Sequence, residues 1–185
     1  MHVEGGRPHP RGRHGERHLL VPHIVVDHIS DLDPRLLRDL GKPNILIDLD
    51  NTLLGWGTDE LEPLVTRWVG DAAAAGLKIC ILSNSRSYRV AYYALQLGVP
   101  YVAVALKPSR TAARGALRLL GSEPCNTAII GDQIFTDILL GNRLGLLTIL
   151  VKPMIMREQL WMRLVRRIER RFWPPTMAPA APPEG

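Results

Sequence analysis

The stretch "ILIDLDNTLL" at residues 45–54 decides the fold, because it places two aspartates directly after an apolar strand. Side chains two residues apart in a strand share a face, so Asp48 and Asp50 are expected on the same side. Two adjacent carboxylates repel each other, and folding then requires a cation or a proton beside them. The stretch therefore predicts a buried strand that ends in an acidic site.

Outside this stretch, runs rich in Val, Ile and Leu alternate with segments of helical periodicity. We expect strands at 44–48, 78–83, 101–105, 127–132 and 147–151. We expect helices at 30–41, 59–76, 87–98, 109–121 and 134–145. Continuous apolar strands that alternate with helices are typical of a parallel sheet buried on both faces. The sequence therefore predicts an α/β fold with helices on both faces of the sheet.

The charge of the chain is concentrated at its ends. The 185 residues are 46% hydrophobic and 22% charged, with a net charge of +5. Residues 1–20 hold four arginines against two acids, and residues 151–185 hold seven basic residues against three acids. We expect one domain at 21–153 between a disordered basic tail at 1–20 and a basic amphipathic helix at 154–173. A disordered Pro/Ala tail is expected at 174–185.

Several features indicate a cytoplasmic protein. No apolar run approaches the roughly 20 residues that a membrane-spanning helix needs. The first 18 residues lack the apolar segment of a secretory signal. Cys80 and Cys125 have no metal-ligand spacing, and two cysteines do not make a disulfide framework.

Polar side chains follow four of the expected strands. Beyond the aspartates of the first strand, Ser83 and Asn84, then Lys107, then Asp132 stand at or after strand ends. Ligands of parallel sheets bind at the carboxyl ends of the strands. Each residue alone could shape a turn or cap a helix, but together the oxygen ligands and one lysine favour Mg²⁺ shared with a substrate phosphate. In such a site one aspartate can attack phosphorus while the other transfers protons.

The same residues form motifs of a known family. "DLDNT" (48–52), "ILSNS" (81–85), Lys107 and "GDQIFTD" (131–137) resemble the four motifs of haloacid-dehalogenase (HAD) superfamily phosphatases. The resemblance covers about residues 21–153 and implies a HAD-like, Rossmann-type fold. The long stretch "GDQIFTDILLGNRLGLLTILVKP" is similar to the YqeG-type subfamily of class IIIA. One departure is Ser85, where many relatives carry a second asparagine.

The resemblance implies a role for each matching residue. Asp48 would be the nucleophile and a Mg²⁺ ligand, and Asp132 another metal ligand. Asp50 would be the general acid and base, with its backbone carbonyl on the metal. Ser83, Asn84 and Lys107 would bind the phosphoryl group. Thr52 would orient the nucleophile loop. Asp137 would support the fourth-motif loop and order Lys107 or a metal-bound water.

The spacing of the motifs leaves no room for a large cap domain. About 30 residues separate Asp50 from Ser83, and 23 separate Ser83 from Lys107. One helix and one strand use up each interval, so we expect an open site. An open site can accept a phosphate that protrudes from a lipid surface, a protein or a nucleic acid.

The helix expected near the C-terminus suggests a partner. In "QLWMRLVRRIERRFW" (159–173), the apolar side chains fall within an arc of about 140° and most arginines lie opposite. Residues 157–173 therefore suit an anionic membrane surface, or equally a face of the same domain or a second subunit. Nucleic acid is disfavoured, because no nucleic-acid-binding fold accompanies the arginines.

The resemblance extends to a substrate, because YqeG-type relatives include phosphatases of phosphatidylglycerophosphate. We expect a Mg²⁺-dependent phosphatase that acts on this lipid head group through a phosphoaspartate, peripheral on the inner face of the membrane. One alternative is an uncapped phosphatase for a soluble or macromolecular phosphate ester. The other is a catalytically idle HAD scaffold that binds a membrane or a partner.

Overall fold

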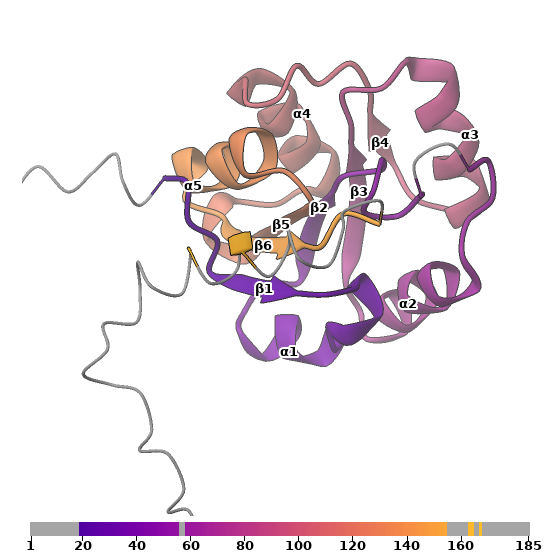
Figure 1. Cartoon of the computed structure of the whole chain (residues 1–185), viewed down its shortest axis with the longest axis horizontal. Helices are drawn as coiled ribbons and strands as arrows, with labels where there is room; N and C mark the ends of the chain where they lie inside the picture. The colour runs from indigo at the N-terminus through magenta and orange to yellow at the C-terminus, as the bar shows by residue number, and fades with distance from the viewer. Residues whose placement is uncertain (1–18, 56–57, 155–162, 165–166, 168–185) are drawn as a thin grey trace, which may run out of the picture.

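A computed structural model describes residues 19–55, 58–154, 163–164 and 167 of the chain. It contains a parallel sheet of six strands in the order β1-β6-β5-β2-β3-β4 (Figure 1). The strands are β1 (Ile24–Val26), β2 (Asn44–Ile47), β3 (Lys78–Leu82), β4 (Tyr101–Val102), β5 (Thr127–Gly131) and β6 (Leu147–Val151). The predicted α/β class with a parallel sheet is confirmed.

Helices connect the strands as the periodicity predicts. They are α1 (Pro34–Asp39), α2 (Pro63–Ala74), α3 (Ser87–Leu97), α4 (Arg110–Leu120) and α5 (Leu139–Leu144). Two 3₁₀ turns, η1 (Ile29–Asp31) and η2 (Pro124–Asn126), and one π-helical turn, η3 (Ile134–Ile138), complete the elements. Asp33 caps α1 by accepting the backbone N–H of Arg35 at 2.8 Å, as expected of an aspartate before Pro34.

Helices lie on both faces of the sheet (Figure 1), and a large cluster of buried side chains lies on each face. In β2, Ile45 and Ile47 pack with α1, α2 and α3, whereas Leu46 packs with α4 and α5. All three side chains are fully buried, which is worth about 1.5–3 kcal/mol each relative to exposure. The sheet is therefore covered on both faces, and the carboxyl ends of its strands are where a site is expected.

Two strands differ from the sequence prediction. The three-residue strand β1 was not predicted, and it pairs with β6 at the edge of the sheet. The strand expected at 101–105 ends at Val102, because Val104 and Leu106 adopt φ angles of 50° and 51° that no strand allows. The helix expected at 134–145 is also divided into the π-helical turn η3 and the short α5.

The tails and the C-terminal helix fall largely outside the described residues. The tails predicted at 1–20 and 174–185 and most of the helix predicted at 154–173 cannot be compared with the structure, and the domain boundaries stay predictions. Leu164 is described, and it packs against Ile138 and Leu150 of the domain. Within the described part of the chain, no helix is both long enough and apolar enough to cross a membrane.

Candidate active site

The loop after β2 fixes the positions of the first two aspartates. The backbone N–H of Asp48 donates to the carbonyl of Ile130 in β5 at 2.9 Å, which fixes Asp48 directly after the end of β2. The chain then turns back, with the N–H groups of Leu53 and Leu54 donating to Leu49 at 3.0 and 2.9 Å. Strand geometry therefore ends at Ile47, and it does not extend to Asp50.

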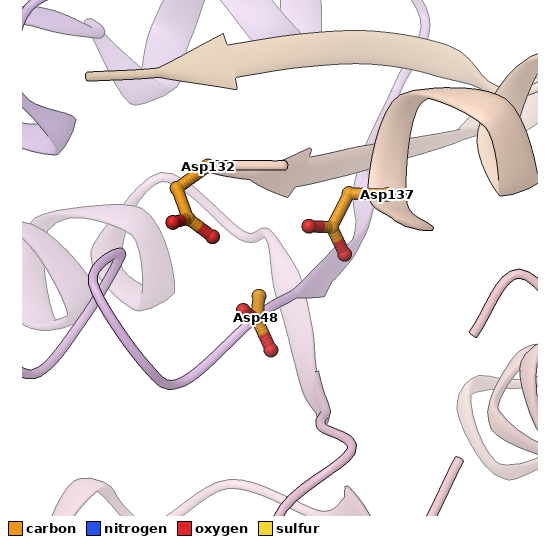
Figure 2. Close-up of side chains that lie close together, drawn as sticks. All are labelled: Asp48, Asp132 and Asp137. Atoms are coloured by element: carbon orange, nitrogen blue, oxygen red, sulfur yellow. The ribbon is translucent and has the colours of Figure 1, made fainter. Parts of the chain in front are cut away.

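Three carboxylates converge beyond β2 and β5. Asp48, Asp132 and Asp137 each offer an oxygen within 4.8 Å of the others (Figure 2). Figure 2 shows Asp48 at the end of β2 facing the two aspartates that follow β5. All three residues are at most 7% exposed. We refer to these three residues as the acidic cluster.

Lys107 supplies the cation of the acidic cluster. Its Nζ lies 2.7 Å from Asp48 Oδ1 and 2.6 Å from Asp137 Oδ1, and its side chain is 3% exposed. Its backbone N–H donates to the side-chain oxygen of Asn84 at 2.7 Å, which ties the loop after β4 to the loop after β3. The Lys107–Pro108 peptide bond is cis. Because burial of unpaired charge is costly, the lysine and its two carboxylates stabilise one another.

The electrostatics of the cluster favour bound protons in the absence of a further cation. Burial raises the pKa of Asp48 to about 7; the Lys107 charge opposes this, and the Asp137 carboxylate adds to it. Burial and the charge of Asp137 raise the pKa of Asp132 to about 6. Burial alone would lower the pKa of Lys107, but Asp137 and Asp48 outweigh it and raise this pKa. One lysine thus does not neutralise three carboxylates.

Gly131 allows Asp137 to reach the cluster. A Cβ atom at Gly131 would lie 2.3 Å from Asp137 Cγ and 2.4 Å from its Oδ2, distances that no real side chain shows. Asp137 Oδ2 also accepts the backbone N–H of Gln133 at 3.3 Å. The "GD" dipeptide therefore combines a position without a side chain and a carboxylate at the same strand end.

The carboxylate of Asp50 has side-chain partners of its own. One carboxylate oxygen accepts a hydrogen bond from the hydroxyl of Ser85, and the other lies 3.2 Å from Arg89 Nη2. Arg89 also lies 3.5 Å from Asp59 and stacks over the ring of Tyr93 at 5.5 Å. The strand ends before Asp50, so strand alternation does not apply to this pair, and the expectation that one metal ion serves both aspartates stays a prediction.

Ser85 and Arg89 are the contacts that sequence reasoning missed. A signal exists for Ser85, since it lies two residues after Ser83 in the second motif. Arg89 lies in the first turn of α3, and nothing in the sequence links it to Asp50. Arg89 and three neighbouring tyrosines line a surface hollow of about 530 Å³ beside Asp50, together with Asp59.

The remaining predicted site residues lie in the same region. Ser83 is buried at the end of β3, and its hydroxyl accepts the backbone N–H of Ser85 at 3.1 Å. The side-chain oxygen of Asn84 is used by the N–H of Lys107. Thr52 is buried, and its hydroxyl has no hydrogen-bond partner among the described residues, so its role stays a prediction.

The acidic cluster fits a divalent cation. Asp132 Oδ1 is buried without a hydrogen-bond partner in the described part of the chain, so it has an open coordination position. The donors are all carboxylate oxygens, the ligands that Mg²⁺ prefers. Asp48, Asp132 and Asp137 could hold the ion, with Asp50 contributing its backbone carbonyl as the resemblance implies.

Comparisons with known proteins find phosphatases and a hydrolase family among the matches. A family model described as "HAD-hyrolase-like" matches residues 104–160, which include Lys107, Asp132 and Asp137. "Probable phosphatase YqeG" of Bacillus subtilis is 34% identical over 154 residues, covering 83% of this chain and 90% of that protein.

Two further matches concern substrate and fold. "Phosphatidylglycerophosphate phosphatase 1, chloroplastic" of Chlamydomonas reinhardtii is 30% identical and covers 86% of this chain, which spans 62% of that enzyme's length. A hypothetical protein from Xanthomonas campestris shares the fold at 15% identity, with a TM-score of 0.51 over 75% of this chain and 79% of that one.

Proposed function

The chain belongs to the YqeG-type phosphatases of the HAD superfamily and is a phosphoric monoester hydrolase, and we propose that it is Mg²⁺-dependent, forms a phosphoaspartate on Asp48 and acts on phosphatidylglycerophosphate. The observation that carries the mechanism is the acidic cluster with its lysine. A nucleophilic carboxylate in this position needs a neighbouring cation, and Lys107 Nζ lies 2.7 Å from Asp48 Oδ1. A purely structural ion pair would not need the two additional buried carboxylates.

The first chemical step uses the charge of Asp48. A carboxylate oxygen of Asp48 attacks phosphorus, the ester P–O bond breaks, and the leaving oxygen takes a proton from Asp50. Lys107 and the Ser83 hydroxyl stabilise the charge on the transferring phosphoryl oxygens. In the second step, Asp50 takes a proton from water, the water oxygen attacks phosphorus, and phosphate leaves with Asp48 restored.

Mg²⁺ bound at the acidic cluster would supply positive charge against the phosphoryl oxygens and the buried carboxylates. Ser85 and Arg89 hold the Asp50 carboxylate in one orientation from two sides. Asp50 is therefore kept out of the ion pair between Asp48 and Lys107, and it remains available for proton transfer to the leaving group.

The substrate proposal is supported by the relatives and by access to the site. The Chlamydomonas relative is named for phosphatidylglycerophosphate, and its similarity covers most of this chain. Within the described residues, the segments between the motifs contain α2 and α3 and no separate cap domain. A lipid phosphate at a membrane surface could reach such a site without entering a closed cavity.

The experiment that tests this proposal compares Asp48→Asn with the full wild-type chain. We expect Asp48→Asn to abolish phosphate release from phosphatidylglycerophosphate, because the amide lacks the attacking charge. The matched control is Asp39→Asn, an exposed aspartate at the end of α1. Wild-type turnover should require Mg²⁺ and stop with EDTA. Substantial turnover by Asp48→Asn, with host contamination excluded, would refute the covalent route.

A panel of substrates separates the alternatives. Faster release from sugar phosphates or nucleotides than from phosphatidylglycerophosphate would favour a soluble substrate. An absence of metal-dependent turnover on any ester would favour an idle scaffold. The presence of Asp48, Asp50, Lys107 and Asp132 together favours an active enzyme over that scaffold.

A further inference from the structure

Exposed apolar side chains occur at the edge of the sheet that carries the acidic cluster. Among the described residues, the large apolar side chains with at least 70% exposure are Tyr88, Leu95, Leu106 and Phe135. Three of these four follow the carboxyl ends of strands: Tyr88 follows β3, Leu106 follows β4 and Phe135 follows β5. Exposed apolar side chains that gather at one edge indicate an interaction surface.

Two of these side chains adjoin the catalytic centre. Leu106 precedes Lys107, and Phe135 lies two residues before Asp137. Lys107 and Asp137 are in contact at 2.6 Å, so the chain segments that carry Leu106 and Phe135 meet at the acidic cluster. Both side chains nevertheless remain exposed, at 71% and 70%. The exposed apolar surface therefore lies beside the position that a phosphate ester must reach.

The loop after β4 is held in an unfavourable conformation that exposes its apolar residues. Val104 and Leu106 have φ angles of 50° and 51°, a left-handed region that is unfavourable for residues other than glycine. Ala105 between them is buried, whereas Val104 is 52% exposed. The N–H groups of Val104 and Ala105 donate to Ser85 and Ser83 at 3.1 and 3.0 Å, so the loop is fixed. Such strain is typical of functional segments.

Basic residues accompany this apolar surface. Arg86 stands before α3 and Arg110 begins α4, and both helices contact β4 (Figure 1). Both arginines are exposed, and neither has an ion-pair partner among the described residues. Exposed acids also occur at this edge: Asp59 and Glu60 belong to the loop after β2, and Asp59 pairs with Arg89. The combination of apolar and unpaired basic side chains is complementary to an anionic lipid surface.

We infer that the protein docks on an anionic phospholipid bilayer through this edge, which we call the lipid-facing rim: Arg86, Val104, Leu106, Arg110 and Phe135. The apolar members enter the head-group region while the arginines contact lipid phosphates. The inference rests on the proposed lipid substrate, and it places membrane contact at the mouth of the active site in addition to residues 157–173. A lipid phosphate would then meet the acidic cluster without leaving the bilayer.

The test measures vesicle binding by the full chain, without substrate. Leu106→Asn combined with Phe135→Gln removes the apolar groups, and asparagine tolerates the positive φ at 106. We expect this double variant to bind phosphatidylglycerol-containing vesicles at least about tenfold more weakly than wild type, because two side chains no longer leave water. The matched control is Leu95→Gln, which removes an 83%-exposed leucine from the far part of α3 and should bind as wild type does.

Other arms identify the source of binding. Vesicles of phosphatidylcholine alone should bind the wild type more weakly, and high salt should reduce binding to anionic vesicles. Equal binding by the double variant and the wild type, or an equal loss in the double variant and Leu95→Gln, would overturn the inference. A wild-type dimer that the double variant converts to a monomer in sedimentation would also overturn it, because the rim would then be a subunit interface.

Failure of this inference is separable from failure of the proposed function. Turnover of detergent-dispersed phosphatidylglycerophosphate tests the chemistry without a bilayer. Wild-type turnover there, combined with vesicle binding that the rim variants leave unchanged, would exclude the rim and retain the phosphatase. Thermal unfolding of each variant shows whether a loss of binding reflects unfolding.

Discussion

Replacement of Lys107 by methionine tests the electrostatics on which the site depends. Methionine has a similar length but no charge, so Asp48 and Asp137 lose the cation that lies 2.7 and 2.6 Å from them. The side chains of these three residues are at most 6% exposed, and water cannot replace the lost contact. Removal of one partner of a buried ion pair costs about 3–5 kcal/mol.

The loss should be visible in urea unfolding of the metal-free protein. With a slope of about 2 kcal/mol per molar urea, the expected loss lowers the unfolding midpoint by about 1.5–2.5 M at neutral pH. Mg²⁺ should restore more stability to Lys107→Met than it adds to the wild type, because the ion supplies the charge that the variant lacks. At an ion concentration 100 times its dissociation constant, binding contributes about 2.7 kcal/mol.

The result also distinguishes charge from packing. Lys78→Met is the control, since Lys78 is exposed at the start of β3 and its loss should change the midpoint little. Acidic pH should reduce the penalty in Lys107→Met, because protonated carboxyl groups no longer need a cation. A metal-free Lys107→Met protein within about 1 kcal/mol of wild type at neutral pH would refute the ion-pair argument.

Three further changes probe the same site. The pKa of Asp48 rises from 3.8 to about 7 on folding, so between these pH values the folded state binds one more proton than the unfolded state. Urea unfolding in EDTA should therefore show a free energy of unfolding that falls as the pH rises from about 4 to 7 and then levels off. Arg89→Ala frees the Asp50 carboxylate, so it should lower kcat on a chromogenic phosphate ester by no more than the roughly 10²–10⁴-fold that acid–base catalysis contributes. An unchanged kcat and pH profile would exclude a positioning role for Arg89. Gly131→Ala should destabilise the fold by about 1–3 kcal/mol and so lower the thermal unfolding temperature, because the added Cβ would lie 2.3 Å from Asp137 Cγ. A melting curve like that of the wild type would contradict this contact.

Much of the fold could be predicted because burial on both faces leaves a clear mark on the sequence. The strands β2, β3, β5 and β6 are apolar runs, and their predicted positions agree with the structure to within one residue at either end. The strand β1 was missed because three residues, "IVV", carry no periodicity. The strand β4 was predicted too long because "YVAVA" has high strand propensity, whereas hydrogen bonds from Val104 and Ala105 to the neighbouring loop impose another conformation.

The location of the site could be predicted for a topological reason. Parallel strands that are adjacent in the sheet bring their carboxyl ends to one edge, so residues after β2 and β5 lie close however far apart they are in sequence. Asp48 and Asp132 were placed together on this ground. The contacts of Ser85 and Arg89 with Asp50 could not be found in this way, because loop and helix side chains determine them.

The two aspartates of "DLDNT" show that proximity in the folded structure, rather than proximity in the sequence, determines which groups lie in one site. Their spacing of two residues predicted a shared environment, but the strand ends at Ile47, and each carboxylate lies beside a different cationic side chain. Asp48 gains Asp132 and Asp137 as neighbours instead, from more than 80 residues away in the chain. Three buried carboxylates with a single lysine leave the cluster short of positive charge. A divalent cation would remove that deficit, and Asp48, the nucleophile that we propose, would then lie beside the positive charges that attract a phosphate.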